Sequence, residues 1–341
     1  MTLMKYYDND LKGQDTGKII ISVVIIAYNR ENFVLDALDS LDAQTLDHEL
    51  FEVIIVSNFD LSGIEKFDSM HIKHIKMGDG SIGLYFKTGI ENAKGEVICL
   101  LEDDDLFEKE KLQRVFQIYK KEVFDYYKNG KIHVTLLNEP TLAPKFVAKF
   151  PESGYIIAGL DKYKTRRIND MGGHPSTISF RKALLVPYLG KMKYVTSEIG
   201  YFIYYIALQH NGRIILDSSI LTRYRISPES DSKSLIDPKR NVEIRKRHLF
   251  RTFDSLQVLY SIVSSPKVLA ELKCEVAFLK CEIDYYHHER PALKEFVLSI
   301  RFILDSTQPF KYALKSVVYK TAHLVFATND INISLNKNSH P

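Results

Sequence analysis

The stretch Gly95-Glu96-Val97-Ile98-Cys99-Leu100-Leu101-Glu102-Asp103-Asp104-Asp105 decides how this chain is interpreted. It joins an apolar run, typical of a buried strand, to four consecutive carboxylates. Four like charges at the end of a strand repel one another, so folding alone gives little reason to place them together. A divalent cation gives a reason, because hard cations take oxygen ligands and neutralise clustered carboxylates. The alternative is a solvated helix start, where acidic side chains are also favoured.

Similar apolar runs occur earlier in the chain. Residues 19–27 and 51–56 are rich in β-branched side chains and indicate strands buried on both faces, and helical spacing of apolar residues lies between the strands. This alternation predicts an α/β fold with a mostly parallel sheet sandwiched by helices, including a helix over residues 109–127. Ligands of such sheets bind beyond the carboxyl ends of the strands. Tyr28, Asn58 and the four acids all follow strand ends, so we expect one shared site there.

The composition is that of a globular protein with a hydrophobic core. The chain has 341 residues, 45% of them hydrophobic, which suggests about two domains. A net charge of +3 is too small to indicate a nucleic-acid partner, and we expect none. No apolar segment is long enough to span a bilayer. The three cysteines form no C-x-x-C pair, so we expect reduced thiols and a cytoplasmic location, with attachment at the inner face of the membrane as the alternative.

The chain is expected to divide into three parts. These are a polar N-terminal leader (1–18), a sheet domain that carries the acidic cluster (19–235) and a helical C-terminal region (236–341). The last part contains the basic stretch 239–248 and amphipathic helical patterns over 293–304 and 310–326. Basic amphipathic helices lie on anionic membranes, or they pack on other protein surfaces. Packing on the sheet domain, or on another copy in a self-associated form, is the preferred interpretation, and peripheral membrane contact stays open.

Four motifs in a fixed order give the chain a family resemblance. They are 22–30 (SVVIIAYNR), 51–58 (FEVIIVSN), 89–97 (GIENAKGEV) and the acids 102–105. Their order and spacing resemble the family-2 glycosyltransferases, which have the GT-A fold and use a nucleotide-activated sugar. The resemblance covers about residues 19–230. No glycine-rich loop follows the first strand, which argues against a nucleotidyltransferase and against a nicotinamide-dependent dehydrogenase.

The resemblance implies a donor site. In the family the residue matching Tyr28 packs on the nucleotide base, and Asn58 stands where an aspartate usually binds the base. The acids resemble the family's Asp-x-Asp-Asp, so the expected metal ligands are Glu102 and Asp104, with Mg²⁺ or Mn²⁺ as the cofactor. Arg225 is expected to reach the diphosphate. The full set expected to contact the nucleotide-sugar is Tyr28, Asn29, Arg30, Asn58, Asp103 and Arg225.

The resemblance also implies an acceptor side. Glu198 matches the general base of inverting members, although a helix-start acid would look the same in sequence. His174 lies in a loop matching the acceptor-facing loop. The expected function is a metal-dependent inverting glycosyltransferase acting on the hydroxyl of a glycan, a glycolipid or a lipid-linked saccharide. The alternative is a non-catalytic binding or scaffolding protein on a degenerate transferase domain, because Asn58, Ile199 and Ser227 depart from the family pattern.

Overall fold

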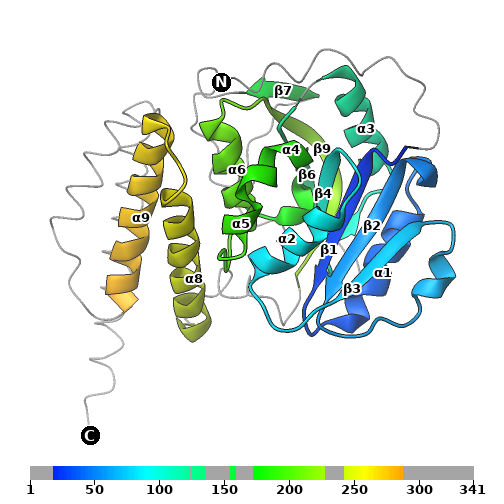
Figure 1. Cartoon of the computed structure of the whole chain (residues 1–341), viewed down its shortest axis with the longest axis horizontal. Coiled ribbons are helices and arrows are strands. Elements are labelled where there is room, and N and C mark those ends of the chain that lie inside the picture. The colour runs from blue at the N-terminus through cyan, green and yellow to red at the C-terminus, as the bar shows by residue number, and fades with distance from the viewer. Residues whose placement is uncertain (1–17, 123, 135–153, 159–171, 227–241, 287–341) are drawn as a thin grey trace, which may run out of the picture.

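The computed structural model of the chain describes residues 18–122, 124–134, 154–158, 172–226 and 242–286. Figure 1 shows a central sheet with helices on both faces and two long helices beside it. Within the described residues, nine strands form one sheet in the order β3-β2-β1-β4-β8-β6-β9-β5, with β7 paired to β9. The strands are β1 (Ile21–Ala27), β2 (Phe51–Ser57), β3 (His71–Lys76), β4 (Val97–Glu102), β5 (Leu106–Phe107), β6 (Tyr126–Val134), β7 (Tyr155–Ala158), β8 (Ile178–Arg181) and β9 (Ile214–Arg225).

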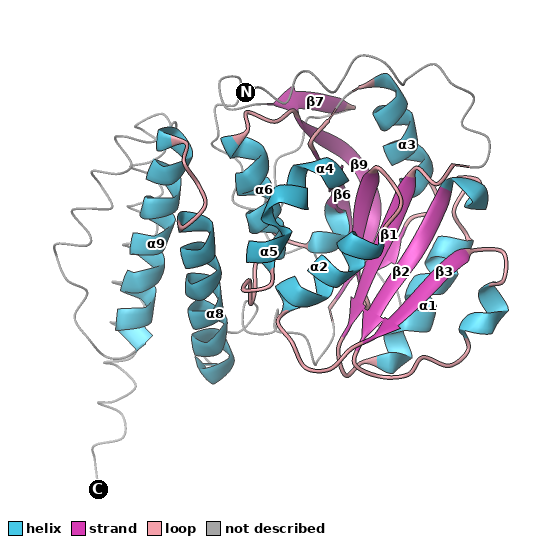
Figure 2. Ribbon diagram, viewed as in Figure 1, coloured by secondary structure: helices cyan, strands magenta, loops and turns pink. Residues whose placement is uncertain are grey.

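The helices lie in two layers and at one end of the sheet (Figure 2). They are α1 (Glu31–Asp42), α2 (Ile82–Asn92), α3 (Lys111–Lys121), α4 (Lys182–Leu185), α5 (Leu189–Met192), α6 (Ile199–Gln209), α8 (Val242–Tyr260) and α9 (Pro266–Tyr286). Short 3₁₀ turns cover His48–Leu50, Ile64–Phe67, Pro175–Thr177 and Val186–Tyr188.

The predicted α/β sheet covered by helices is confirmed, and its two halves differ. Strands β1, β2, β3 and β4 pair in parallel. Beyond them the sheet is mixed, because β8 runs antiparallel to both β4 and β6. The carboxyl ends of β1, β2 and β4 therefore meet at one edge, as the sequence predicts.

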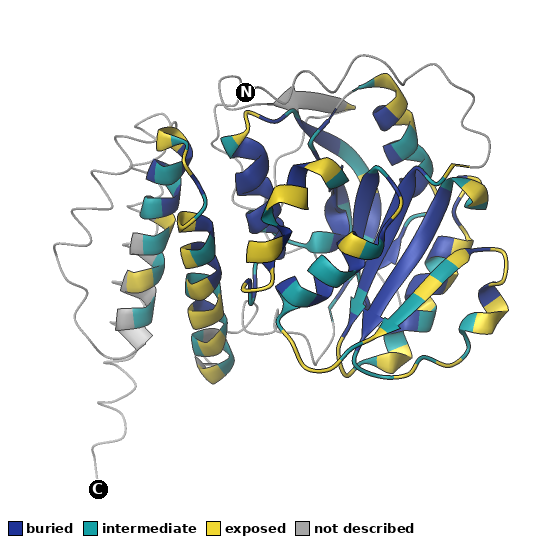
Figure 3. Cartoon of the chain, in the orientation of Figure 1, coloured by how far each residue is buried: buried dark blue, intermediate teal, exposed yellow. Residues whose placement is uncertain are grey.

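The core explains why the strand sequences are continuously apolar. Alternate side chains of a strand point to opposite faces of a sheet. Val24 packs into a cluster with α2 and α6, whereas Val23 and Ile25 pack into the cluster under α1 and α3. Figure 3 shows these strands buried and the outer helix surfaces exposed. Both faces of β1 thus lie against a core. A strand that alternates apolar and polar residues would put polar side chains into one of these cores, so the sequence of β1 is almost entirely apolar.

The helix predicted over residues 109–127 is shorter than expected. Helix α3 ends at Lys121, and Tyr126 begins β6. The prediction was wrong at this end because apolar spacing alone does not distinguish a helix from a short strand. Tyr126 and Tyr127 are buried between β8 and β9, where their backbones pair with both neighbours.

The C-terminal region is helical as far as it is described, and it packs on the sheet domain. Leu256 and Leu259 of α8 and Leu272 of α9 join the same apolar cluster as α6. Within the described part of the chain, no helix is long and apolar enough to cross a membrane. Residues 1–17 of the expected leader and the amphipathic patterns at 293–304 and 310–326 lie outside the described residues.

Candidate active site

A cleft of about 1180 Å³ opens at the carboxyl ends of β1 and β4 and reaches α6 and α8. Its volume exceeds the range of roughly 300–1,000 Å³ typical of small-molecule pockets, which leaves room for more than one reactant. Seven predicted site residues line it, namely Tyr28, Asn29, Arg30, Glu102, Asp104, His174 and Glu198. The other three predicted residues, Asn58, Asp103 and Arg225, lie beside or beneath the cleft.

Tyr28 forms one side of the cleft, directly after β1. Its hydroxyl donates a hydrogen bond to Oδ1 of Asp79 at 2.7 Å, and its ring meets that of Tyr85 edge-on, with the centroids 5.9 Å apart. The residue is 44% exposed, so much of the ring stays open. A ring held at its edge and open elsewhere is suited to stacking on a planar base.

Asn58 does not line the cleft but closes the ends of β1 and β2. Its Oδ1 accepts from the backbone N–H of Asn29 at 2.9 Å, and its Nδ2 donates to Oδ1 of Asn29 at 2.7 Å. Asn29 has a φ of 58°, which asparagine tolerates better than most residues. The pair of amides therefore fixes the sharp turn that follows Tyr28, and the predicted base contact of Asn58 stays a prediction.

Arg30 is the internal counter-ion of the acidic motif. Its guanidinium donates two hydrogen bonds to the carboxylate of Asp103, and Nη1 donates to Oδ2 of Asp104 at 2.5 Å. The Asp103 side chain is completely buried. Burial raises the pKa of Asp103 to about 7 even though Arg30 opposes the shift. The sequence suggested a nucleotide contact for Arg30 and Asp103 but not this pairing.

Asp105 anchors the motif to the rest of the sheet. Its carboxylate accepts from Oγ of Ser176 at 2.5 Å and from the backbone N–H of Arg225 at 3.0 Å. Ser176 Oγ also accepts from the backbone N–H of Glu102 at 3.0 Å. Burial, followed by repulsion from Asp104, raises the pKa of Asp105 to about 8. Asp105 is thus a structural acid whose oxygens are already in use.

Arg225 supports the same motif from beneath. Its side chain is 1% exposed and donates to the backbone carbonyl of Asp104 and, at 2.6 Å, to Oδ2 of Asp36. The guanidinium also lies 5.3 Å from the ring centroid of Phe33. The structure thus places Arg225 behind the acids, and not at the surface of the cleft where a diphosphate contact was expected.

Glu102 and Asp104 are the two acids of the motif that line the cleft. Burial, and then repulsion from Asp105 and Asp104, raises the pKa of Glu102 well above its usual range. Among the described residues, no set of three or more His, Cys, Asp or Glu side chains is arranged to hold a metal ion. Two carboxylates nevertheless fit Mg²⁺, which keeps several waters and takes further oxygens from phosphates. Carboxylate oxygens are donors that suit Mg²⁺, and the assignment of Glu102 and Asp104 as the metal ligands stays a prediction.

Two buried lysines, which sequence reasoning missed, hold the loop that carries His174. Lys111 donates to Oδ1 of Asn129 at 2.8 Å, to the carbonyl of Ser176 at 2.6 Å and to Oγ1 of Thr222 at 3.3 Å. Burial lowers the pKa of Lys111 to about 7. A lysine inside an amphipathic helix pattern gave no sign of this role, because its three partners come from β6, β9 and the loop.

The second lysine, Lys128, donates to the carbonyl of Gly173 at 2.6 Å. The same loop lies tightly against α6, since a Cβ on Gly172 would come within 2.2 Å of Cγ of Tyr201. His174 has a φ of 57°, and its ring centroid lies 4.3 Å from that of Tyr224. The loop is therefore fixed on both sides, and it places His174 on the cleft as predicted.

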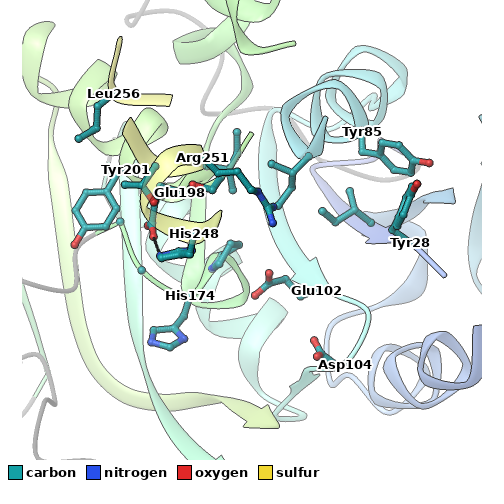
Figure 4. A pocket seen from close by; sticks show the side chains of 18 of the residues that line it. Tyr28, Tyr85, Glu102, Asp104, His174, Glu198, Tyr201, His248, Arg251 and Leu256 are labelled. Carbon is teal, nitrogen blue, oxygen red and sulfur yellow. Dashed lines mark hydrogen bonds and ion pairs between the residues drawn. The ribbon is translucent and has the colours of Figure 1, made fainter. Parts of the chain in front are cut away.

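Glu198 lies on the opposite side of the cleft from Tyr28, with Glu102 and Asp104 between them (Figure 4). It is the N-cap residue of α6, with a φ of 56°, and its carbonyl accepts from the N–H of Phe202 at 3.2 Å. Its Oε1 lies 3.3 Å from Nε2 of His248 in α8. His248 was missed as a site residue, although the basic stretch 239–248 that contains it stood out in the sequence.

The sequence was compared with models of known protein families. The sequence model described as glycosyl transferase family 2 matches residues 22–185. Residues 22–185 of this chain form a family-2 glycosyltransferase domain. The matched range includes Tyr28 and the acidic motif, whereas Glu198 and α8 lie beyond it.

Curated relatives match part of the chain. A glycosyltransferase of Rickettsia felis is 32% identical over 98 residues, which are 27% of this chain and 16% of that protein. The poly(ribitol-phosphate) beta-glucosyltransferase of Bacillus spizizenii is 31% identical over 113 residues, 31% of this chain and 18% of the relative. The aligned region thus spans less than a fifth of the length of either relative.

Solved structures share the fold over almost the whole chain. TarS 1–349 of S. aureus in complex with UDP superposes with a TM-score of 0.59 at 15% identity, covering 92% of each chain. The mannosyltransferase PcManGT of Pyrobaculum calidifontis, in complex with GDP-Man and Mn²⁺, gives a TM-score of 0.52 at 12% identity, covering 94% of this chain and 82% of the other. The predicted GT-A-type architecture is therefore confirmed.

Proposed function

We propose that this chain transfers a sugar from a nucleoside-diphosphate sugar to an acceptor hydroxyl. One observation carries the proposal: a single cleft is lined by the open ring of Tyr28 and the acids Glu102 and Asp104, and on its far side by Glu198. Tyr28 and the two acids suit a nucleotide and its diphosphate, whereas Glu198 suits a hydroxyl that must lose a proton. A donor and an acceptor would then meet between them.

On the donor side, Tyr28 stacks on the base, and Asn29 shapes the turn beneath it. A Mg²⁺ or Mn²⁺ ion held by Glu102 and Asp104 would offset the negative charge that develops on the leaving diphosphate. The nucleotide-bound structures with the same fold support this arrangement, because they contain UDP in one case and GDP-Man with Mn²⁺ in the other. Arg30 keeps Asp103 and Asp104 in place from one side.

On the acceptor side, Glu198 accepts the proton of the attacking hydroxyl. A bond forms between the acceptor oxygen and the anomeric carbon while the bond from that carbon to the phosphate oxygen breaks, and the diphosphate leaves with the electron pair. Attack from the side of Glu198, opposite the diphosphate, inverts the anomeric configuration. His174, fixed beside this position, would contact the acceptor, which we propose is a glycan, a glycolipid or a lipid-linked saccharide.

The relative that acts on poly(ribitol-phosphate) adds a polymer hydroxyl to the acceptors worth testing. A cytoplasmic location, peripheral membrane contact and self-association through the C-terminal region stay predictions. Vesicle flotation and light scattering of the purified chain would test the last two.

The alternative function is binding without turnover. One observation favours it: Arg30 already supplies positive charge to both Asp103 and Asp104, which a catalytic metal would otherwise do. In that case the domain would bind a nucleotide-sugar and present it, or itself, to a partner.

The deciding experiment measures release of the nucleoside diphosphate from UDP-, GDP- and TDP-sugars, with Mn²⁺ or Mg²⁺ and with saccharide and polyol-phosphate acceptors. Release that depends on the metal and is lost in Glu198→Gln supports the proposal, and NMR of the product would show the inverted anomer. Calorimetric binding of a donor without release supports the alternative. Absence of binding by every donor would contradict both functions.

A further inference from the structure

Helix α8 lies outside the family-2 domain in sequence but belongs to the cleft in space. Three of its side chains, those of His248, Arg251 and Leu256, are drawn in Figure 4 beside Glu198 and Tyr201 of the catalytic domain. Glu198 and His248 are 50 positions apart in the chain, so their meeting here is a product of the tertiary fold.

The backbone just before Glu198 is tied to α8. Ser255, which is 2% exposed, accepts through Oγ from the backbone N–H groups of Thr196 and Ser197, each at 3.0 Å. Arg251 donates from Nε and Nη2 to the carbonyl of Thr196 at 3.1 and 2.9 Å. Both N–H groups and one carbonyl ahead of Glu198 are thus engaged by one helix.

This clamp matters because Glu198 has an unfavourable backbone conformation. Its φ of 56° is left-handed, which a non-glycine residue adopts only where its surroundings enforce it. Helix α6 fixes the residue on one side through the bond from Phe202, and α8 fixes the other side through the clamp. The backbone is therefore aimed before any substrate arrives.

The carboxylate is also held. Nε2 of His248 lies 3.3 Å from Oε1 of Glu198, and the two side chains are only 21% and 22% exposed. The pair sits largely out of solvent, where a single contact restricts rotation of the glutamate more than it would at an open surface. A carboxylate restrained at one oxygen keeps the second oxygen for the acceptor proton.

We propose that α8 is a working part of the catalytic centre and that His248 is the residue that positions the carboxylate of Glu198 for proton transfer. The inference rests on the proposed function, in which Glu198 is the proton acceptor. It makes the C-terminal region necessary for turnover rather than an attached module.

The kinetic test compares His248→Ala and His248→Gln in the full-length protein. We expect His248→Ala to lower kcat by about 10- to 100-fold, the range for losing a contact to a charged group, while the KM for the donor changes less than twofold. His248→Gln should recover most of kcat, because its amide nitrogen lies close to the position of Nε2. If His248→Ala lowered kcat only by disturbing the packing of α8, the amide of His248→Gln would not restore kcat.

The matched control is His71→Ala. His71 pairs with Glu49 at 3.5 Å on the exposed strand β3, with side chains 51% and 68% exposed. The substitution removes the same kind of histidine–glutamate pair at a place remote from the cleft, so kcat should be unchanged. If the wild type transfers sugar, Glu198→Gln is inactive and His248→Ala keeps full kcat, the inference fails while the proposed function stands.

A spectroscopic test is independent of turnover. In ¹⁵N-histidine-labelled protein, the Nε2 resonance that disappears in His248→Gln should shift in Glu198→Gln and stay in place in Glu49→Gln. An unmoved resonance in Glu198→Gln would overturn the inference. If the wild type transfers no sugar, the proposed function fails, and this measurement alone decides whether the pair exists.

Discussion

Arginine 30 gives the sharpest prediction about stability. Its guanidinium is 27% exposed, whereas the Asp103 carboxylate that it grips is completely buried. Removing one partner of a buried ion pair costs about 3–5 kcal/mol, because the remaining carboxylate must either stay charged without its partner or take up a proton inside the protein. Part of the arginine reaches solvent, so we expect Arg30→Gln to lower the free energy of unfolding by about 2–4 kcal/mol at pH 7.5.

Urea unfolding in the presence of EDTA measures this effect. Arg213→Gln is the matched control, since Arg213 pairs with Glu122 while 41% exposed and should lose no more than about 1 kcal/mol. Adding Asp103→Asn to Arg30→Gln removes the buried carboxyl group that has lost its partner and should restore most of the loss. A loss below about 1 kcal/mol in Arg30→Gln, or a double variant as unstable as the single one, would refute the reasoning.

Three further outcomes are expected. Ser255→Ala leaves the buried N–H of Ser197 and the part-buried N–H of Thr196 without their acceptor, and it should cost about 2–4 kcal/mol in urea unfolding. Ser261→Ala changes an exposed serine just after the same helix and should stay within about 0.5 kcal/mol, so equal losses would contradict the clamp. Burial lowers the pKa of Lys111 to about 7, so the unfolded protein binds more protons than the folded protein between pH 7 and about 10. The stability of the wild type relative to Lys111→Met should therefore rise with pH in that range, by at most about 1.4 kcal/mol per pH unit, and level off below pH 7. A stability difference that does not change with pH would argue against the shift. Tyr28→Ala should weaken UDP or GDP binding in calorimetry by about 1–3 kcal/mol, while Tyr194→Ala, at an exposed tyrosine, should not; similar affinities for both would remove Tyr28 from the base site.

Several site residues were accessible from the sequence because their signals are local. Tyr28 and the acids each directly follow a buried apolar run, and parallel strands bring their carboxyl ends together. Glu198 and His174 came from the family resemblance, and both line the cleft. Asn58 and Arg225 lie near the site, as the family pattern indicated. Their hydrogen bonds, however, are made to other residues of the protein and do not face the cleft.

The partners of these residues were not accessible. Arg30 and Asp103 are 73 positions apart, and Asp105 and Arg225 are 120 positions apart. Nothing in either local pattern selects one arginine for one acid, because many basic and acidic residues are available in the chain. The pairing of His248 with Glu198 could not be predicted either, because in the sequence His248 is one polar residue within a basic stretch.

The sequence by itself determined which segments are strands and helices in the parallel half of the sheet, and where the acids fall relative to a strand end. Those properties depend on the alternation of apolar and polar residues over a few positions, which the chain carries directly. Only the tertiary structure decided which acids face the cleft, which are consumed by Arg30, Ser176 and Arg225, and that α8 returns to hold Glu198. Such pairings depend on distances between remote segments, and those distances exist only once both layers of helices have packed on the sheet.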